Sequence, residues 1–483
     1  YKLENDWQNI EVWTDRIAKD GIGRPEDVAA VQKQVASFKL GQKFDRATAL
    51  YEEKKFIEAA EEFERVVNED PTSKFMDKAL YNAAIAYQDA KHWNSAARVF
   101  ERIVIEPRFA GSQYREDALF YMAENSRKFF AFDRSVTLYQ GLVDSFKSSE
   151  RAPYALFQAA RLQEMQGNFK EASTLYRKYS TDFATRDDSA QALYNIGQIA
   201  SKTGDKTGEI ALWKEFITRY SATPGADSKI VEANLRLGNL FKAKGDWKSA
   251  SKYYETTIAE FERRTLKPGS TAAAFPAQAR FELVEATFRT YEKLKLQGST
   301  ASQGRIAQEK KTTLAILEAK YAEVFPYKAF DWTVAAYFRV GQIYQLYAQM
   351  LYDAPDPSGL SDDDLDIFRT AVEEEAIKWE NVAIVRYETT LTNARELKIV
   401  NEWSQKTLKE LNSYKPSEYP LFKAERRQYD FSVDSVIPFT GPIEPTSAPQ
   451  VAPEAEPEAP SPPPEPSIPP EPEAEPAPEG GAS

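Results

Sequence analysis

The sequence predicts an all-α fold, a solenoid of stacked helical hairpins followed by a disordered tail rich in proline, glutamate and alanine. Three observations predict it. A pattern of small and aromatic residues first seen between residues 40 and 71 recurs five times. Each copy has the spacing of two helices joined by a tight turn. The last 46 residues include 16 prolines, with glutamate and alanine between them. Self-similarity at a fixed period is typical of repeat architectures, and the tail composition cannot bury an apolar core.

Each copy places a small residue in its first helix, an aromatic residue after the turn, a second small residue and then another aromatic residue. The second copy shows all four as Ala84, Trp93, Ala96 and Phe100. Small residues let the two helices approach closely, and the rings fill the space beside them. The first small residues and last aromatic residues of the six copies are Ala47 and Phe63, Ala84 and Phe100, Ala123 and Tyr139, Ala160 and Tyr176, Gly197 and Trp213, and Gly238 and Tyr254.

The fifth copy departs from the pattern. Gly197 and Trp213 are in place, but Lys206 and Glu209 occupy the positions where an aromatic residue and an alanine are expected. The fifth copy therefore matches the pattern less well than the other five.

The residues that carry the pattern resemble the tetratricopeptide (TPR) family. The segments 167–172 (GNFKEA), 192–197 (ALYNIG) and 245–250 (GDWKSA) stand where that family has its characteristic positions, and Asp70-Pro71 closes the first repeat in the same way. The resemblance covers residues 40–262 well and 275–412 loosely. It implies a right-handed TPR-type α-solenoid.

The interval between copies is longer than usual for that family. Successive repeats begin 37, 39, 37, 37 and 41 residues apart, against about 34 in most TPR proteins. In this respect the chain resembles the long-period TPR proteins of bacterial cell envelopes, which include outer-membrane assembly, Tol–Pal-associated and gliding-motility proteins.

Five segments follow from these patterns. We expect an N-terminal capping or partial helical hairpin over 1–39, with one helix up to residue 20 and a second from Glu26 to about Leu40. The remaining segments are six repeats over 40–262, degenerate helical repeats over 263–412, an irregular stretch over 413–437 and the acidic proline-rich tail over 438–483. Within the degenerate repeats we expect helices over 276–296 and 303–324, a hairpin from Trp332 with its partner helix over 362–391, and a last helix over 393–412.

Charge and composition exclude several classes of protein. The net charge is −12, and the stretch after Arg427 has no basic residue but two Asp and nine Glu, so the first 427 residues carry about −1. Phosphate binding needs clustered Lys and Arg, which argues against a nucleic-acid partner. No run of 18 apolar residues is present, as a membrane-spanning helix would need. The absence of cysteine excludes disulfides and thiolate sites; it fits an exported protein and ordinary drift about equally well. The chain begins at Tyr1, which suggests a processed product or a fragment, so membrane tethering through an upstream segment stays open.

A second aromatic and apolar series lies three residues before each small residue of the first helices. In TPR proteins that position tends to face the concave groove, so the resemblance predicts a binding face for an extended or helical segment of a partner. The alternative is that these side chains pack between neighbouring first helices and belong to the core. The series is Phe44, Tyr81, Phe120, Phe157, Tyr194, Leu235 and Phe338.

Sites of other kinds are not predicted. The single histidine, His92, lies in a turn that is usually solvated, so neither a catalytic triad nor a histidine metal site is expected. Phosphate-binding glycine loops are absent. The acidic run 361–366 is best explained as a helix start, with Ser361 as N-cap. A chaperone-type carboxylate clamp is not expected either, because its Lys and Asn positions hold Phe44 with Thr48 and Tyr81 with Ile85.

The sequence therefore predicts a non-enzymatic protein–protein interaction scaffold with no cofactor, metal or small-molecule substrate. Its partners are expected to be proteins in a periplasmic or envelope-associated assembly or motility complex, with a cytoplasmic location as the alternative. The proline-rich tail would act as a spacer. A second hypothesis is an assembly or secretion chaperone that binds client polypeptides transiently.

Overall fold

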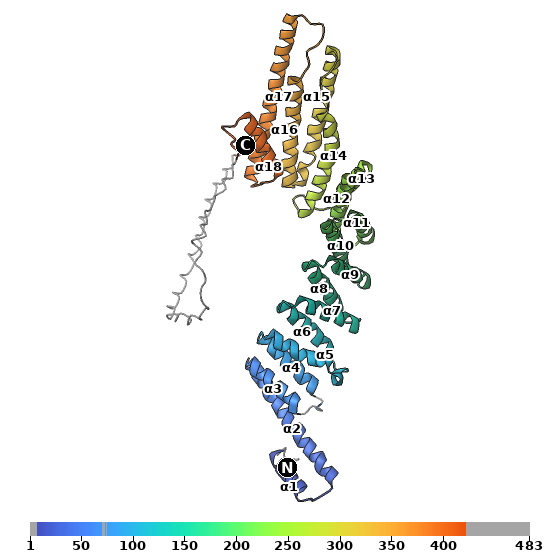
Figure 1. Cartoon of the computed structure of the whole chain (residues 1–483), viewed down its shortest axis with the longest axis vertical. Coiled ribbons are helices and arrows are strands. Elements are labelled where there is room, and N and C mark those ends of the chain that lie inside the picture. The colour runs from blue at the N-terminus through green and yellow to red at the C-terminus, as the bar shows by residue number, and fades with distance from the viewer. Residues whose placement is uncertain (1–6, 70–72, 74, 422–483) are drawn as a thin grey trace, which may run out of the picture. The chain divides into compact units, whose positions relative to one another are not determined.

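The computed structural model describes residues 7–69, 73 and 75–421, and within these ranges every regular element is helical. Consecutive α-helices lie side by side along the chain (Figure 1). Their bounds are α1 Trp7–Lys19, α2 Pro25–Glu52, α3 Phe56–Glu69, α4 Met76–Asp89, α5 Trp93–Ile105, α6 Arg115–Lys128, α7 Phe132–Ser145, α8 Ala152–Met165, α9 Phe169–Asp182, α10 Ser189–Thr203, α11 Lys206–Tyr220, α12 Asp227–Ala243, α13 Trp247–Arg263, α14 Ala274–Glu292, α15 Thr300–Ala322, α16 Phe330–Tyr352, α17 Asp362–Glu396 and α18 Glu402–Tyr414.

These helices form an α-solenoid of stacked hairpins, which confirms the predicted fold class. In each of the six repeats a first helix packs against a second helix, and the second helix packs against the next hairpin. The pairs are the C-terminal half of α2 with α3, then α4–α5, α6–α7, α8–α9, α10–α11 and α12–α13.

A contact between a ring and a small residue explains the spacing of the pattern. In every repeat the second aromatic residue of the pattern lies sixteen positions after the first small residue, and in the fifth and sixth repeats its ring packs on that residue. A Cβ added to Gly197 would lie 2.5 Å from the Trp213 ring, and one added to Gly238 would lie 2.5 Å from the Tyr254 ring. Glycine is therefore required where the ring comes closest, and alanine suffices in the other repeats.

The turn between the two helices of each repeat contains one residue in the left-handed backbone region. Gly167, Gly204 and Gly245 fill this place in repeats four to six, with φ between 74° and 81°, whereas Lys54, Lys91 and Phe130 fill it in repeats one to three. Glycine adopts this conformation without steric cost, and other residues do so less readily.

The predicted end of the second helix near Leu40 is wrong. The helix α2 runs from Pro25 to Glu52 without a break and supplies both the N-terminal cap and the first helix of the first repeat. Gly41 stays helical within it, with open space around the place a Cβ would take. The helix α1 packs on the N-terminal part of α2, where Trp7 stacks on Phe38 with ring centroids 4.7 Å apart.

The fifth repeat is a complete hairpin despite its weak sequence. Glu209 is buried where alanine was expected, and its carboxylate accepts a hydrogen bond from the Trp213 indole N–H at 3.0 Å. Because that donor satisfies the buried carboxylate, the larger side chain is tolerated.

The degenerate region contains five helices, α14 to α18. Tyr387 of α17 packs on Gly341 of α16, where an added Cβ would lie 2.7 Å from the ring, so these long helices reproduce the repeat contact over a wider sequence spacing. A buried Glu285 in α14 accepts hydrogen bonds from both Arg339 of α16 (2.9 and 2.7 Å) and Tyr321 of α15 (2.7 Å), which ties the three helices together.

The helix α17 begins at Asp362 as predicted, but it ends later than predicted, and α18 begins later. The helix α17 continues to Glu396 rather than 391, and α18 begins at Glu402 rather than 393. Lys398, at φ 55°, reverses the chain between them, and Asn401 and Ser404 form a reciprocal capping box at the start of α18. Asp70-Pro71, most of the predicted irregular stretch and the whole proline-rich tail lie outside the described residues.

Candidate functional site

The predicted binding series lies on the first helices, with one member on each of α2, α4, α6, α8, α10, α12 and α16. Its rings contact both the second helix of the same hairpin and the following repeat. Tyr81 is an example: its ring lies 6.0 Å from that of Phe100 in α5 and 4.7 Å from that of Tyr114, which precedes α6. The series therefore follows the seam between neighbouring repeats.

Burial divides this series into two groups. Leu235 and Phe338 are 4% and 3% exposed, so they contribute packing and offer almost no surface to a partner. The other five members are half-buried: Phe44, Tyr81, Phe120, Phe157 and Tyr194. Only these five combine packing with an accessible edge.

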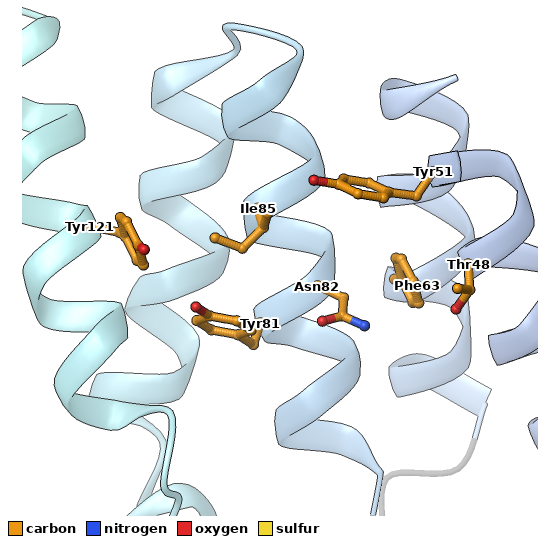
Figure 2. Close-up of a pocket in the computed structure, with 7 residues that line it drawn as sticks. All are labelled: Thr48, Tyr51, Phe63, Tyr81, Asn82, Ile85 and Tyr121. Carbon is orange, nitrogen blue, oxygen red and sulfur yellow. The ribbon is translucent and has the colours of Figure 1, made fainter. Parts of the chain in front are cut away.

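A pocket of about 340 Å³ opens on the first-helix face in the second repeat. Figure 2 shows its side chains in a row across three neighbouring repeats, with Tyr51 and Thr48 toward one end and Tyr121 at the other. The buried Phe63 ring of α3 belongs to its lining. The full set of lining residues is Thr48, Tyr51, Phe63, Tyr81, Asn82, Ile85 and Tyr121.

Sequence reasoning found only part of this pocket. Tyr81 is the single member of the predicted series that lines it, and Thr48 and Ile85 had been singled out only as positions incompatible with a carboxylate clamp. Tyr51, Asn82 and Tyr121 were missed. Tyr51 lies seven residues after Phe44, two helical turns further along the same face, and that spacing could have revealed it.

Two tyrosine hydroxyls of the pocket donate hydrogen bonds to carboxylates. Tyr51 donates to Asp89, and this bond together with burial raises the pKa of Tyr51 to about 12. Tyr81 donates to Asp117 at 3.2 Å, and burial, followed by the charge of Asp117, raises the pKa of Tyr81. Both phenols therefore stay protonated at neutral pH and act as fixed donors to the carboxylates beside the pocket.

The other candidates of the sequence analysis behave as follows. His92 is exposed in the turn before α5. Ser361 caps α17, and its hydroxyl accepts a hydrogen bond from the Asp364 N–H at 3.2 Å, as predicted. Among residues 7–69, 73 and 75–421, no group of three or more His, Cys, Asp or Glu is placed to hold a metal ion. Over the same ranges, no helix has the length and apolar character needed to cross a bilayer.

The chain is similar to several solved structures at low sequence identity. MamA is 14% identical over 38% of this chain and 97% of its own, with a TM-score of 0.27. YrrB, described as a TPR protein with an unusual peptide-binding site, is 16% identical over 37% of this chain and 86% of its own, with a TM-score of 0.27. A tetratricopeptide repeat protein from Parabacteroides merdae ATCC 43184 is 11% identical over 56% of this chain and 98% of its own, with a TM-score of 0.25. No curated protein sequence matches the chain.

One hairpin of the array matches a known repeat family. Residues 154–185, which span nearly all of α8 and α9, match the family model of the tetratricopeptide repeat. A contact between a small residue and a ring sixteen positions later recurs in the two hairpins that follow this match. The chain therefore contains a tetratricopeptide repeat at residues 154–185, within an α-solenoid of similar hairpins.

Proposed function

We propose that this protein is a non-catalytic scaffold that binds a segment of a partner protein on the first-helix face of its repeats. The observation that carries the proposal is the pocket around Tyr81, which is lined mainly by aromatic side chains and is open on that face. Half-exposed aromatic side chains in a pocket are typical of the residues that dominate the binding energy of protein interfaces.

The proposed contact extends beyond the pocket along the half-buried members of the series. Phe120 and Phe157 continue the same seam on α6 and α8, and a partner segment lying across the first helices would meet them in order. An extended or helical segment fits such a row, because its side chains recur at regular spacing.

We also propose that the protein belongs to a cell-envelope assembly or motility complex of a bacterium. The support is the repeat interval of 37 to 41 residues, which resembles the long-period repeat proteins of envelopes. Fractionation of the source cells tests this location, and recovery of the full-length protein with cytoplasmic markers alone would contradict it.

Affinity purification of the tagged full chain from its source cells tests the binding role. The wild type should retain a partner in fixed stoichiometry at moderate salt. The double variant Ile85→Ala/Tyr121→Ala should weaken that binding by at least about tenfold, since hot-spot truncations often cost 2 kcal/mol or more. Phe120→Ala/Phe157→Ala tests the wider seam in the same way.

Ile105→Ala provides the matched control, because Ile105 is an exposed apolar residue at the end of a second helix, 67% exposed. Circular dichroism should show equal helicity in all variants. Full-strength binding by both double variants would contradict the proposed face. Recovery of many unfolded proteins in small amounts would instead favour the chaperone role.

A further inference from the structure

Three of the six rings in the first-helix series have a basic side chain of this same chain beside them. Lys78 places its ammonium 5.3 Å from the centre of the Phe44 ring, Arg151 its guanidinium 4.7 Å from the Phe120 ring, and Lys229 its ammonium 5.8 Å from the Tyr194 ring. Each cation comes from the start of the next repeat. Such distances allow the attraction between a cation and the negative face of an aromatic ring.

Among the described residues, the rings of Phe157 and Phe338 have no such cation, and neither does that of Tyr81 in the second repeat. Tyr114 stacks on the Tyr81 ring there, with planes 23° apart. Over the described ranges, no lysine or arginine lies over the ring of Tyr51 or Tyr81, and the third tyrosine of the pocket, Tyr121, has Arg151 5.6 Å from its ring centre. Two rings of the pocket, those of Tyr51 and Tyr81, thus have no cation of the described residues over them.

The charges around the pocket favour a cation as well. All seven lining residues are uncharged. Of the two carboxylates that accept from its tyrosines, Asp117 is also paired with Arg151. Asp89 is exposed, accepts from Tyr51, and forms no ion pair among the residues described. Its negative charge therefore stands beside the Tyr51 side of the pocket with no basic side chain opposing it.

We infer that the pocket accepts a lysine or arginine side chain of the partner segment, an inference that rests on the proposed function. The aromatic rings contact the aliphatic stem and attract its cationic end, and Asp89 supplies the opposing charge. The pocket is open, so the cation keeps part of its hydration and does not bear the full cost of burial. An acidic side chain would meet like charge at Asp89, which excludes it from this place.

A displayed library of random 12-residue peptides, selected on the full chain, tests the inference without a known partner. Peptides that bind wild type but lose binding to Ile85→Ala/Tyr121→Ala are retained, synthesised and measured by fluorescence polarisation. We expect them to share one Lys or Arg. Replacing it by norleucine should weaken binding by about 3- to 30-fold, and the loss should shrink at high salt.

Two protein variants complete the design. Tyr51→Leu keeps an apolar side chain but removes the ring, and Asp89→Asn removes the charge. Both variants should bind the Lys or Arg peptide more weakly than the wild type does, and they should bind the norleucine form of the peptide nearly as well as the wild type does. Asp187→Asn, an exposed carboxylate in the turn between α9 and α10, is the matched charge control and should change neither.

The outcomes distinguish a failure of the cation inference from a failure of the proposed binding face. Pocket-dependent peptides that bind equally well with norleucine would overturn the cation inference and leave the binding face intact. A library that yields no peptide sensitive to the pocket variants would overturn both.

Discussion

At the scale of single residues, the most regular feature of this molecule is a ring packed on a small residue sixteen positions earlier. The contact sets the distance between the two helices of a hairpin, because a larger side chain in the first helix would displace the ring. It also explains why Gly197 and Gly238 stand within helices, where glycine is otherwise unfavourable relative to alanine.

Gly197→Ala should therefore destabilise the protein although alanine is the better helix former. The new Cβ would meet the Trp213 ring at 2.5 Å, and that ring is fully buried. We expect a loss of about 1–3 kcal/mol, typical of overpacked cores, measured from urea unfolding midpoints. Gly141→Ala is the control: nothing lies within 4 Å of its added Cβ, so this substitution within α7 should stabilise the helix. A Gly197→Ala variant as stable as Gly141→Ala would refute the contact.

A buried lysine makes a second residue-scale prediction, on pH. Lys310 is 2% exposed, its ammonium donates to the Leu294 carbonyl at 2.9 Å, and burial lowers the pKa of Lys310 to about 8. Between this value and the ordinary lysine pKa near 10.4 the unfolded chain holds more protons than the folded one. Lys310 should therefore make a contribution to the free energy of unfolding of the protein that rises with pH in this window.

Lys310→Met removes that contribution. From pH 8 to 9.5, the free energy of unfolding of the wild type should therefore increase relative to that of this variant. Lys320→Met, at an exposed lysine of the same helix, should show no such trend. A pH-independent difference for Lys310→Met would contradict the lowered pKa.

At the scale of elements, the second small residue of each repeat lets the second helix approach the first. Ala96 and Ala172 are fully buried at these crossings. Ala96→Leu and Ala172→Leu should each cost about 1–3 kcal/mol by overpacking. Ala49→Leu, at an exposed position of α2, should be nearly neutral. Thermal midpoints of the two crossing variants within error of wild type would show that the predicted register is wrong.

The hairpins could be predicted because their signal is local and repeated. Six copies of small and aromatic residues locate the helix pairs from residue 40 onward, and even the fifth pair folds as predicted. The sequence could not reveal that the Trp213 indole N–H would donate a hydrogen bond to the buried Glu209 carboxylate, because this bond depends on the orientation of one indole.

The errors arose where a local signal was weak or a partner was distant. The start of the repeat pattern near residue 40 suggested a helix boundary, but α2 continues from Pro25 to Glu52 and serves both the cap and the first repeat. The contact of Gly341 with Tyr387 spans 46 residues instead of sixteen, so the fixed spacing could not find it. The pocket was missed in part because four helices from three successive repeats build it, and no single repeat shows the combination of Tyr51, Tyr81 and Tyr121.

At the scale of the whole described array, the hairpins share their cores. Val104 and Leu138 pack against the buried clusters of both the first and the middle repeats, so adjacent hairpins are not independent units. Nearest-neighbour packing of this kind stabilises repeat arrays. It also holds the first helices beside one another, and the pocket depends on this arrangement because its residues come from α2, α3, α4 and α6.

Site-specific photo-crosslinking tests the central claim, that a partner segment occupies the first-helix face, most directly. A benzophenone side chain would be placed at Asn82, which lines the pocket, and at Thr174, which is exposed on the second helix α9. Irradiation of source cells should give a discrete crosslinked partner from position 82 and little from position 174. Equal crosslinking at both positions, or crosslinking at position 174 alone, would contradict the account.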